Sequence, residues 1–170
     1  LSVVEKVLPE MKKKFSLDFE LKAEAGDVLN LIQQKNAVAL HIRRTDYLYG
    51  KTGDRFGGIC TDTYYQKAIR RIKNTVSNPF FVVFSDDIES VKKQFDIPDS
   101  YFVRGNPGYL DLYLMSRCHH FILANSTFSF WAAMLSENEE KTVFVPEYWY
   151  NHPLEKEKYI PEEWRRIKIS

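Results

Sequence analysis

Five short apolar runs, each bounded by polar or turn-forming residues, recur along the chain. They are Ala37–Ile42, Phe80–Phe84, Tyr101–Val103, Phe121–Ala124 and Thr142–Val145. Their content of β-branched and aromatic residues predicts β-strands. Nearly continuous apolar runs such as FFVVF and FILA are typical of strands that are buried on both faces.

Segments with helical spacing of apolar residues lie between these runs. The predicted helices are Thr63–Val76, Ile88–Phe95, Tyr109–Ser116 and Phe128–Ser136, and Thr61 or Asp62 is a suitable N-cap for the first of them. Alternation of strand and helix is the pattern of a parallel sheet that is covered by helices on both sides. The sequence therefore predicts an α/β protein with a doubly wound, Rossmann-like parallel sheet.

Residues 36–170 form one domain in this interpretation, and residues 1–35 form an N-terminal segment in which Val28–Gln34 is helical. Lys51–Cys60, a segment rich in glycine, predicts a mobile loop. Pro161–Ile167 predicts a short helix near the end of the chain. A chain of 170 residues has room for one such domain but not comfortably for two.

Three of the predicted strands run directly into polar clusters. The first strand is followed by Arg43-Arg44-Thr45-Asp46-Tyr47, the second by Ser85-Asp86-Asp87, and the fourth by Asn125-Ser126-Thr127. Ligands of open parallel sheets bind beyond the carboxyl ends of the strands, and these ends share one edge. We therefore expect the three clusters to converge on one candidate site.

Arginine in the first cluster suits a ligand that carries phosphate. Side chains alternate along a strand, so His41 and Arg43 share one face and Arg44 takes the other. A guanidinium group binds phosphate oxygens in bidentate fashion and stabilises charge that develops on a departing diphosphate. The alternative for both arginines is a structural network with nearby aspartates: Asp46, Asp86 or Asp111. The alternative for His41 is a core histidine with a structural role.

The other two clusters allow more than one role. Ser126 and Thr127 precede a predicted helix, whose N-terminus attracts anions, although Asn125 or Ser126 could simply cap that helix. Asp86 suits recognition of a base or ribose, and Asp87 suits capping of the next helix.

Composition narrows the class of ligand. The net charge of +1 gives no field that would favour nucleic acid or an anionic membrane, and no apolar run has the length of a membrane span. Cys60 and Cys118 lack metal-ligand spacing, so two free thiols in a reducing compartment are the simplest interpretation, with a disulfide left open. His119 and His120 point to opposite faces, and no metal site is expected.

The residues resemble the α-1,2-fucosyltransferase family, inverting enzymes that use GDP-L-fucose. His41–Tyr47 is similar to the HxRRxDY motif of that family, and the likeness continues through Thr63–Ala68, Phe84–Asp87, Asp111–Ser116 and His119–Trp131. These collinear blocks span about residues 36 to 149. The family is built from two lobes of the GT-B type. The resemblance therefore implies that this chain is the C-terminal, donor-binding lobe, with residues 1–35 part of, or a linker from, an acceptor lobe.

The resemblance also implies roles for individual residues. Arg43 resembles the diphosphate ligand, Arg44 supports the site, and His41 lies beside the nucleotide. Asp86 resembles the carboxylate that reads guanine or ribose, and Asn125, Ser126 and Thr127 resemble the phosphate-binding turn. We expect Arg43, Asp46 and His41 to act in catalysis without a metal or other cofactor, with Asp46 the first candidate for the base and Asp54 the second.

The expected reaction transfers L-fucose from GDP-L-fucose to a galactose-containing glycan. Thr45 stands where the family usually has glycine and is similar to α-1,6 relatives, so transfer with α-1,6 or another linkage is the first alternative. A non-catalytic domain that binds a guanine nucleotide or a sugar is the second, and a purely structural α/β domain is the third. The expected location is the bacterial cytoplasm, with peripheral association with the inner membrane left open, or the Golgi lumen if an anchor has been removed.

Overall fold

The computed structural model describes residues 2–15, 23–47, 50–151 and 159–168. Six parallel strands form one sheet in the order β3-β2-β1-β4-β5-β6. Their bounds are β1 Asn36–Ile42, β2 Pro79–Ser85, β3 Ser100–Phe102, β4 His120–Ile122, β5 Val143–Pro146 and β6 Arg165–Ile167. This order is that of the doubly wound dinucleotide-binding fold, so the predicted fold class is confirmed.

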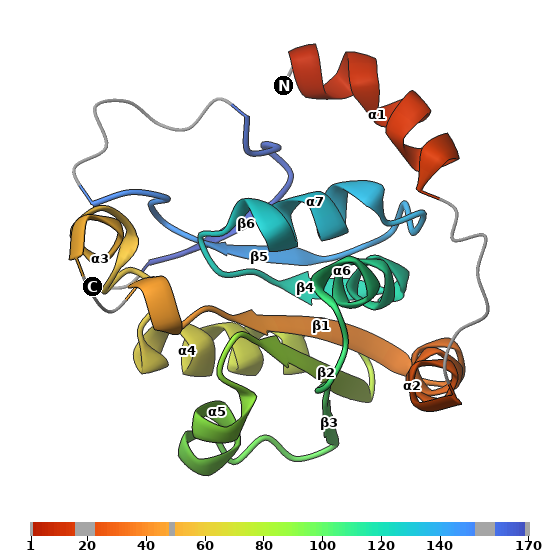
Figure 1. Ribbon diagram of the computed structural model, residues 1–170, viewed down its shortest axis with the longest axis horizontal. Helices are drawn as coiled ribbons and strands as arrows, with labels where there is room; N and C mark the ends of the chain where they lie inside the picture. Colours follow the sequence, from red (N-terminus) through yellow and green to blue (C-terminus); the bar gives the residue numbers. More distant parts are fainter. Residues whose placement is uncertain (1, 16–22, 48–49, 152–158, 169–170) are drawn as a thin grey trace.

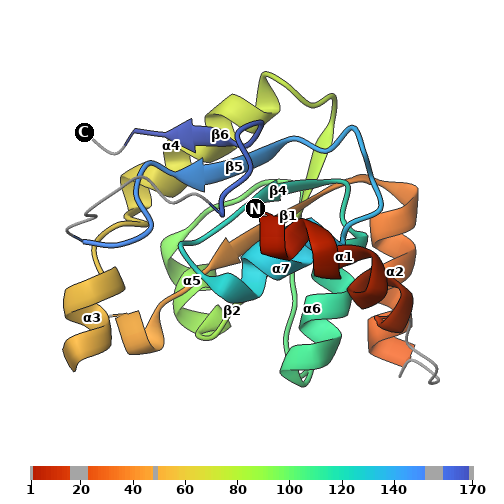
Figure 2. The ribbon, with the colours of Figure 1, turned by 90° about the horizontal axis from the view of Figure 1, so that it is seen from above.

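Helices cover both faces of the sheet (Figure 1). One face carries α2 (Ala23–Gln34), α6 (Gly108–Arg117) and α7 (Thr127–Leu135), with α1 (Ser2–Lys14) lying over α7 (Figure 2). The other face carries α4 (Asp62–Lys73) and α5 (Ile88–Gln94). A single 3-10 turn, η1 (Thr45–Tyr47), and the short helix α3 (Gly50–Phe56) lie beyond the carboxyl end of β1.

The alternation of β1 separates two hydrophobic cores. Ala37 and Ala39 face the core that lies under α2, α6 and α7, whereas Val38, Leu40 and Ile42 face the core under α4 and α5. All five side chains are fully buried. Because β1 is covered on both faces, its residues from Ala37 to Leu40 form one uninterrupted apolar run, as the sequence indicated.

Helix α2 shares its core with the sheet. Ala25, Val28 and Ile32 recur on its inner face and are buried with residues of α6 and β1. This confirms the helix predicted at Val28–Gln34 and extends it toward the N-terminus. Residues 16–22 lie outside the described part of the chain. The assignment of residues 1–35 to an acceptor lobe or its linker stays a prediction.

Two predictions about local structure were wrong. The segment expected to be a mobile loop, Lys51–Cys60, contains helix α3, and α3 has no buried residue that could have marked it in the sequence. The helix expected at Pro161–Ile167 is absent: turns lead into strand β6, which pairs in parallel with β5 from Phe144 to Pro146. Trp164 and Ile167 are buried there, so tertiary packing decides the conformation of this segment.

Candidate active site at the carboxyl edge of the sheet

The sheet topology brings the three polar clusters together. The strand order reverses between β1 and β4, and in such folds ligands bind at this point, beyond the carboxyl ends of the strands. The hydroxyl of Thr45 donates to Asp86, which joins the first cluster to the second. The hydroxyl of Tyr47 donates to the carbonyl of Asn125 at 3.0 Å, which joins the first cluster to the third. The expected convergence is therefore confirmed.

Asp86 holds the turn after β1. One carboxylate oxygen accepts the backbone N–H of Arg44 at 2.8 Å, and the other accepts the N–H of Thr45 at 3.0 Å and also its hydroxyl. Burial by itself raises the pKa of Asp86, but the hydrogen bonds from Thr45 and Arg44 and the charge of Arg43 outweigh it and lower the pKa. The structure thus gives Asp86 a positioning role, and its contact with a base or ribose stays a prediction.

Arg43 keeps part of its guanidinium group available. Its Nε lies 2.8 Å from Asp46 Oδ1 and 3.4 Å from Asp86 Oδ2. The hydrogen bond to Asp46 is the main cause of a raised pKa for Arg43, so the group stays charged. Within the described part of the chain, neither terminal nitrogen of Arg43 has a hydrogen-bond partner. The two terminal nitrogens can therefore bind a pair of ligand oxygens.

Arg44 points to the opposite side of β1, as the alternation predicted. Its Nη2 lies 2.6 Å from Gln94 Oε1 and 3.3 Å from Asp62 Oδ1, and its guanidinium covers the ring of Phe95. The structural alternative thus holds for Arg44, although Asp62 was not among the partners expected. Asp111, one of the expected partners, instead accepts a hydrogen bond from Asn106 at 3.1 Å.

His41 is buried on the side of α6 and α7. It is 3 % exposed, and its ring centroid lies 5.7 Å from that of Phe128 at the start of α7. Burial, and next the charge of Arg43, lower the pKa of His41 to about 4. A neutral imidazole directly behind Arg43 is therefore the form present near pH 7. Direct participation of His41 in catalysis stays a prediction.

The third cluster forms the N-terminus of α7. Ser126 Oγ accepts the N–H of Phe128 at 3.3 Å, which makes Ser126 the cap, while Thr127 is exposed. Asn125 has a different role: its Nδ2 donates to the carbonyls of Phe56 at 2.9 Å and Trp149 at 3.1 Å. The open end of α7 carries partial positive charge next to Arg43's strand, which suits an anionic ligand.

Helix α3 and its anchor, Asn151, were missed by sequence reasoning. The backbone N–H of Asn151 donates to the carbonyl of Arg55 at 2.8 Å, and its side chain donates to the carbonyls of Asp54 at 3.0 Å and Gly57 at 2.9 Å. Phe56 stacks on Tyr47 with ring centroids 5.4 Å apart. No local pattern in the sequence indicates these contacts, because about one hundred residues separate the partners.

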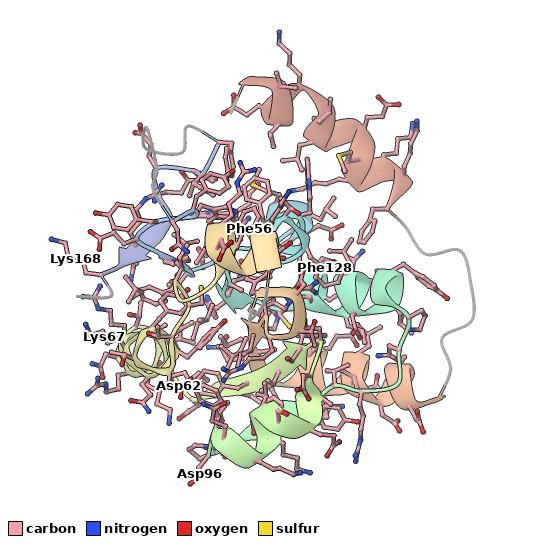
Figure 3. All side chains as sticks on the ribbon, turned by 60° about the vertical axis from the view of Figure 1, so that its left-hand side comes forward. Phe56, Asp62, Lys67, Asp96, Phe128 and Lys168 are labelled. Atoms are coloured by element: carbon pink, nitrogen blue, oxygen red, sulfur yellow. The ribbon has the colours of Figure 1, made fainter. Side chains whose placement is uncertain are left out.

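A cavity of about 440 Å³ opens between η1, α3 and the start of α4. Arg43, Tyr47, Phe56, Asp62, Gln94 and Asn125 are among its lining residues. Figure 3 labels Phe56 of α3, Asp62 of α4 and Phe128 of α7 in one view of the side chains. Both Arg43 and Arg44 line the cavity together with Asn125, so it opens at the edge where the first and third polar clusters meet.

Asp111 is a second residue that sequence reasoning gave no site role. It lies in the first turn of α6, on the same side of the sheet as His41, and burial raises its pKa to about 6. Perturbed carboxyl groups are frequent at functional sites. The sequence could have indicated a role for Asp111 because this residue begins Asp111–Ser116, one of the blocks that resemble the α-1,2-fucosyltransferase family.

The remaining polar candidates have structural roles. His119 Nδ1 accepts from the backbone N–H of Ala37 and His120 Nδ1 from that of Thr142, so each ring is held by a different neighbouring segment. Both cysteines are free, and burial raises the pKa of Cys60 to about 12. In the residues that the structure describes, no group of three His, Cys, Asp or Glu side chains could hold a metal ion, and no helix is long and apolar enough to cross a membrane.

Comparison with known proteins agrees with the fold and the motifs. Residues 8–168 match the model of glycosyl transferase family 11. An alpha-1,2-colitosyltransferase of Escherichia coli is 34 % identical over 94 % of this chain and 57 % of its own length. The galactoside 2-alpha-L-fucosyltransferase Sec1 of Mus musculus is 31 % identical over 81 % of this chain and 39 % of its own. The chain thus spans about half the length of these relatives, or less.

A solved structure shares the fold. The crystal structure of POFUT1 in complex with GDP superposes with a TM-score of 0.50 at 16 % identity, over 79 % of this chain and 48 % of that one. This likeness concerns architecture only, whereas the family match covers nearly the whole sequence, including all three polar clusters. The chain belongs to glycosyl transferase family 11.

Proposed function

We propose that this chain binds GDP-L-fucose at the carboxyl edge of its sheet and is the donor half of an α-1,2-fucosyltransferase. The enzyme would transfer L-fucose, with inversion, to a hydroxyl of a galactose-containing glycan. One observation carries the proposal: Arg43 and the N-terminus of α7 lie at the same edge of the sheet, where the strand order reverses. Among the described residues, the two terminal nitrogens of Arg43 have no hydrogen-bond partner. Both features suit a diphosphate.

Each residue of the edge has a stated part in this proposal. Arg43 binds the diphosphate and stabilises the charge that builds on it as fucose departs, in a role that other enzymes give to a metal ion. Asp86 holds Arg43's turn, and Arg44 braces that turn against Asp62. Ser126 and Thr127 present the end of α7 to the phosphates.

The acceptor hydroxyl loses its proton during transfer, and Asp46 is the first candidate for the base. Its side chain is about half exposed and lies on η1, next to Arg43. Asp54 of α3, the second candidate, is also exposed. Because Asp46 accepts the hydrogen bond from Arg43 Nε, its availability as a base depends on how Arg43 moves when the donor binds.

Colitose is the second candidate for the transferred sugar. The relative matched over 94 % of this chain is named an alpha-1,2-colitosyltransferase. Both candidates keep the same linkage, so they differ only in the contacts made to the sugar ring. Parallel assays with the fucose and colitose donors separate them.

A thermal-shift titration with GDP, GDP-fucose, ADP and UDP tests the donor site. Ligand at 100 times its Kd adds about 2.7 kcal/mol of stability, which raises the Tm of a domain of this size by about 5–10 °C. We expect shifts with GDP and GDP-fucose alone, unchanged by EDTA. Arg43→Ala should weaken GDP binding by about 10- to 100-fold through loss of charge-assisted bonds.

Arg71→Ala is the matched control, because Arg71 is exposed in the last turn of α4. It should bind GDP as the parent chain does. Equal shifts with all four nucleotides, or equal GDP affinity in Arg43→Ala and Arg71→Ala, would contradict the proposal.

A further inference from the structure

Tyr47 ends the 3-10 turn η1 and lies where three parts of the candidate site meet. Its backbone N–H donates to the carbonyl of Arg44 at 3.2 Å, which closes the turn after β1. Its side chain is partly buried and lines the cavity together with Arg43, Phe56 and Asn125. The proposed donor function gives this side chain no part, although it contacts each of these three residues.

The hydroxyl of Tyr47 fixes the side chain to the start of α7. It donates to the carbonyl of Asn125 at 3.0 Å, and Asn125 directly precedes Ser126, the cap of that helix. The acceptor is itself held in place, because Asn125 is 1 % exposed and its Nδ2 donates to the carbonyls of Phe56 and Trp149. The ring of Tyr47 also stacks on Phe56, with 17° between the ring planes. The Tyr47 ring is therefore held both through its hydroxyl and through its face.

The guanidinium group of Arg43 packs against this ring. Its central carbon lies 5.8 Å from the ring centroid of Tyr47, within the distance of about 6 Å at which an aromatic face attracts a cation. The other contacts of the group among the described residues are made through Nε, which lies 2.8 Å from Asp46 Oδ1 and 3.4 Å from Asp86 Oδ2. Contacts at Nε restrain one corner of this planar group, and the ring supplies the second restraint that fixes the direction of the terminal nitrogens.

Tyr47 thus connects the two groups that suit a diphosphate. The terminal nitrogens of Arg43 can bind one pair of ligand oxygens, and the N-terminus of α7 attracts further negative charge. Affinity for a diphosphate therefore depends on how these two groups are placed relative to each other. A long side chain loses conformational freedom when it binds a ligand, and the loss is smaller when the free protein already holds that side chain in place.

We propose that Tyr47 is a positioning residue of the donor site, whose ring orients the Arg43 guanidinium and whose hydroxyl sets that ring against the start of α7. The inference rests on the proposed donor function and adds the residue that aligns its two diphosphate-binding groups. Tyr47 acts through Arg43 and makes no bond of its own to the diphosphate. A purely structural Tyr47 would instead affect GDP binding to the same extent whether Arg43 is present or absent.

Calorimetric titration with GDP tests the inference. Tyr47→Leu removes both the ring and the hydroxyl, whereas Tyr47→Phe keeps the ring, and each change is made in the parent chain and in Arg43→Ala. Tyr150→Leu is the matched control, because Tyr150 also packs on Phe56, with ring centroids 5.5 Å apart, and also pairs its hydroxyl within the chain. The described lining of the cavity does not include Tyr150.

We expect Tyr47→Leu to bind GDP about tenfold more weakly than the parent chain and Tyr47→Phe about threefold more weakly, with Tyr150→Leu unchanged. In Arg43→Ala, Tyr47→Leu should have no further effect, because the ring then has no guanidinium to orient. Parent-like affinity of Tyr47→Leu, an equal loss in Tyr150→Leu, or the same loss with and without Arg43 would overturn the inference.

Thermal unfolding shows whether each variant folds. If Tyr47→Leu does not fold, Tyr47→Phe provides the same comparison, with a threefold loss in the parent chain and none in Arg43→Ala. GDP binding by the parent chain is measured first. Its absence contradicts the proposed donor function, whereas GDP binding that the Tyr47 variants leave unchanged contradicts the positioning role alone.

Discussion

Gly57 is the position where one added carbon should disturb the cavity most. An alanine Cβ there would lie 2.3 Å from the carbonyl oxygen of Tyr47 and 2.6 Å from that of Gly53. Both atoms belong to the backbone, so no side-chain rotation relieves the contact. Gly57→Ala should therefore separate the end of α3 from η1.

The size of the effect follows from what holds α3 in place. Four hydrogen bonds, three from Asn151 and one from Asn125, and the stack of Phe56 on Tyr47 fix the helix. At about 1 kcal/mol each, they set a cost of about 5 kcal/mol for local opening. Overpacking against backbone costs about 3 kcal/mol, the upper end of its usual range, and should lower this cost to about 2 kcal/mol.

Limited proteolysis with trypsin measures this opening, because α3 carries Lys51 and Arg55. When opening is fast, cleavage follows the population of the open form, so its rate should rise about 100-fold in Gly57→Ala. Gly26→Ala is the control: a Cβ at this helix position meets nothing within 4 Å, and the change should leave cleavage in α3 unaltered. Circular dichroism checks that both variants stay folded.

Cleavage at Lys51 and Arg55 with the same rate in Gly57→Ala as in the parent chain would refute the reasoning. It would mean that η1 and α3 move apart without loss of the anchoring contacts. A large loss of global stability with no specific cleavage in α3 would equally refute it, since α3 has no buried residue and should detach first.

Three further perturbations have defined outcomes. Burial lowers the pKa of His41 to about 4, so between pH 6.5 and 4 the unfolded chain binds more protons than the folded chain, and stability present above pH 6.5 is lost as the pH falls. Urea unfolding of the parent chain should show a loss of about 3 kcal/mol in the free energy of unfolding over this range, and the loss should be absent in His41→Asn. Asp86 has a lowered pKa, so its contribution to stability is present above its unfolded value of 3.8 and is lost as pH falls; Asp86→Asn should be less stable at pH 7, and the difference should shrink toward pH 3. Asn151→Ala removes two side-chain hydrogen bonds that hold α3 and should raise tryptic cleavage there by about 10- to 30-fold. Unchanged cleavage would show that the backbone hydrogen bond of Asn151 is enough to hold α3 in place.

The sequence by itself determined the alternation of the first five strands with helices and the polar residues that follow three of those strands. Strand β1 could be predicted from the sequence because burial on both faces leaves no polar position between Ala37 and Leu40. The two-residue period of a strand also placed Arg43 and Arg44 on opposite sides of β1. Parallel pairing then brings the carboxyl ends to one edge, so the meeting of the three clusters followed from local patterns.

Tertiary structure decided the features whose energies come from distant partners. Helix α3 has no apolar stripe and is held by Asn125 and Asn151, so composition alone indicated a loop. Residues 165–167 join the sheet because β5 offers an unpaired edge and the core accepts Trp164 and Ile167. The cavity exists only when η1, α3 and α4 are packed together. Local propensity cannot encode such contacts, because they stabilise a conformation only after the chain has folded around them.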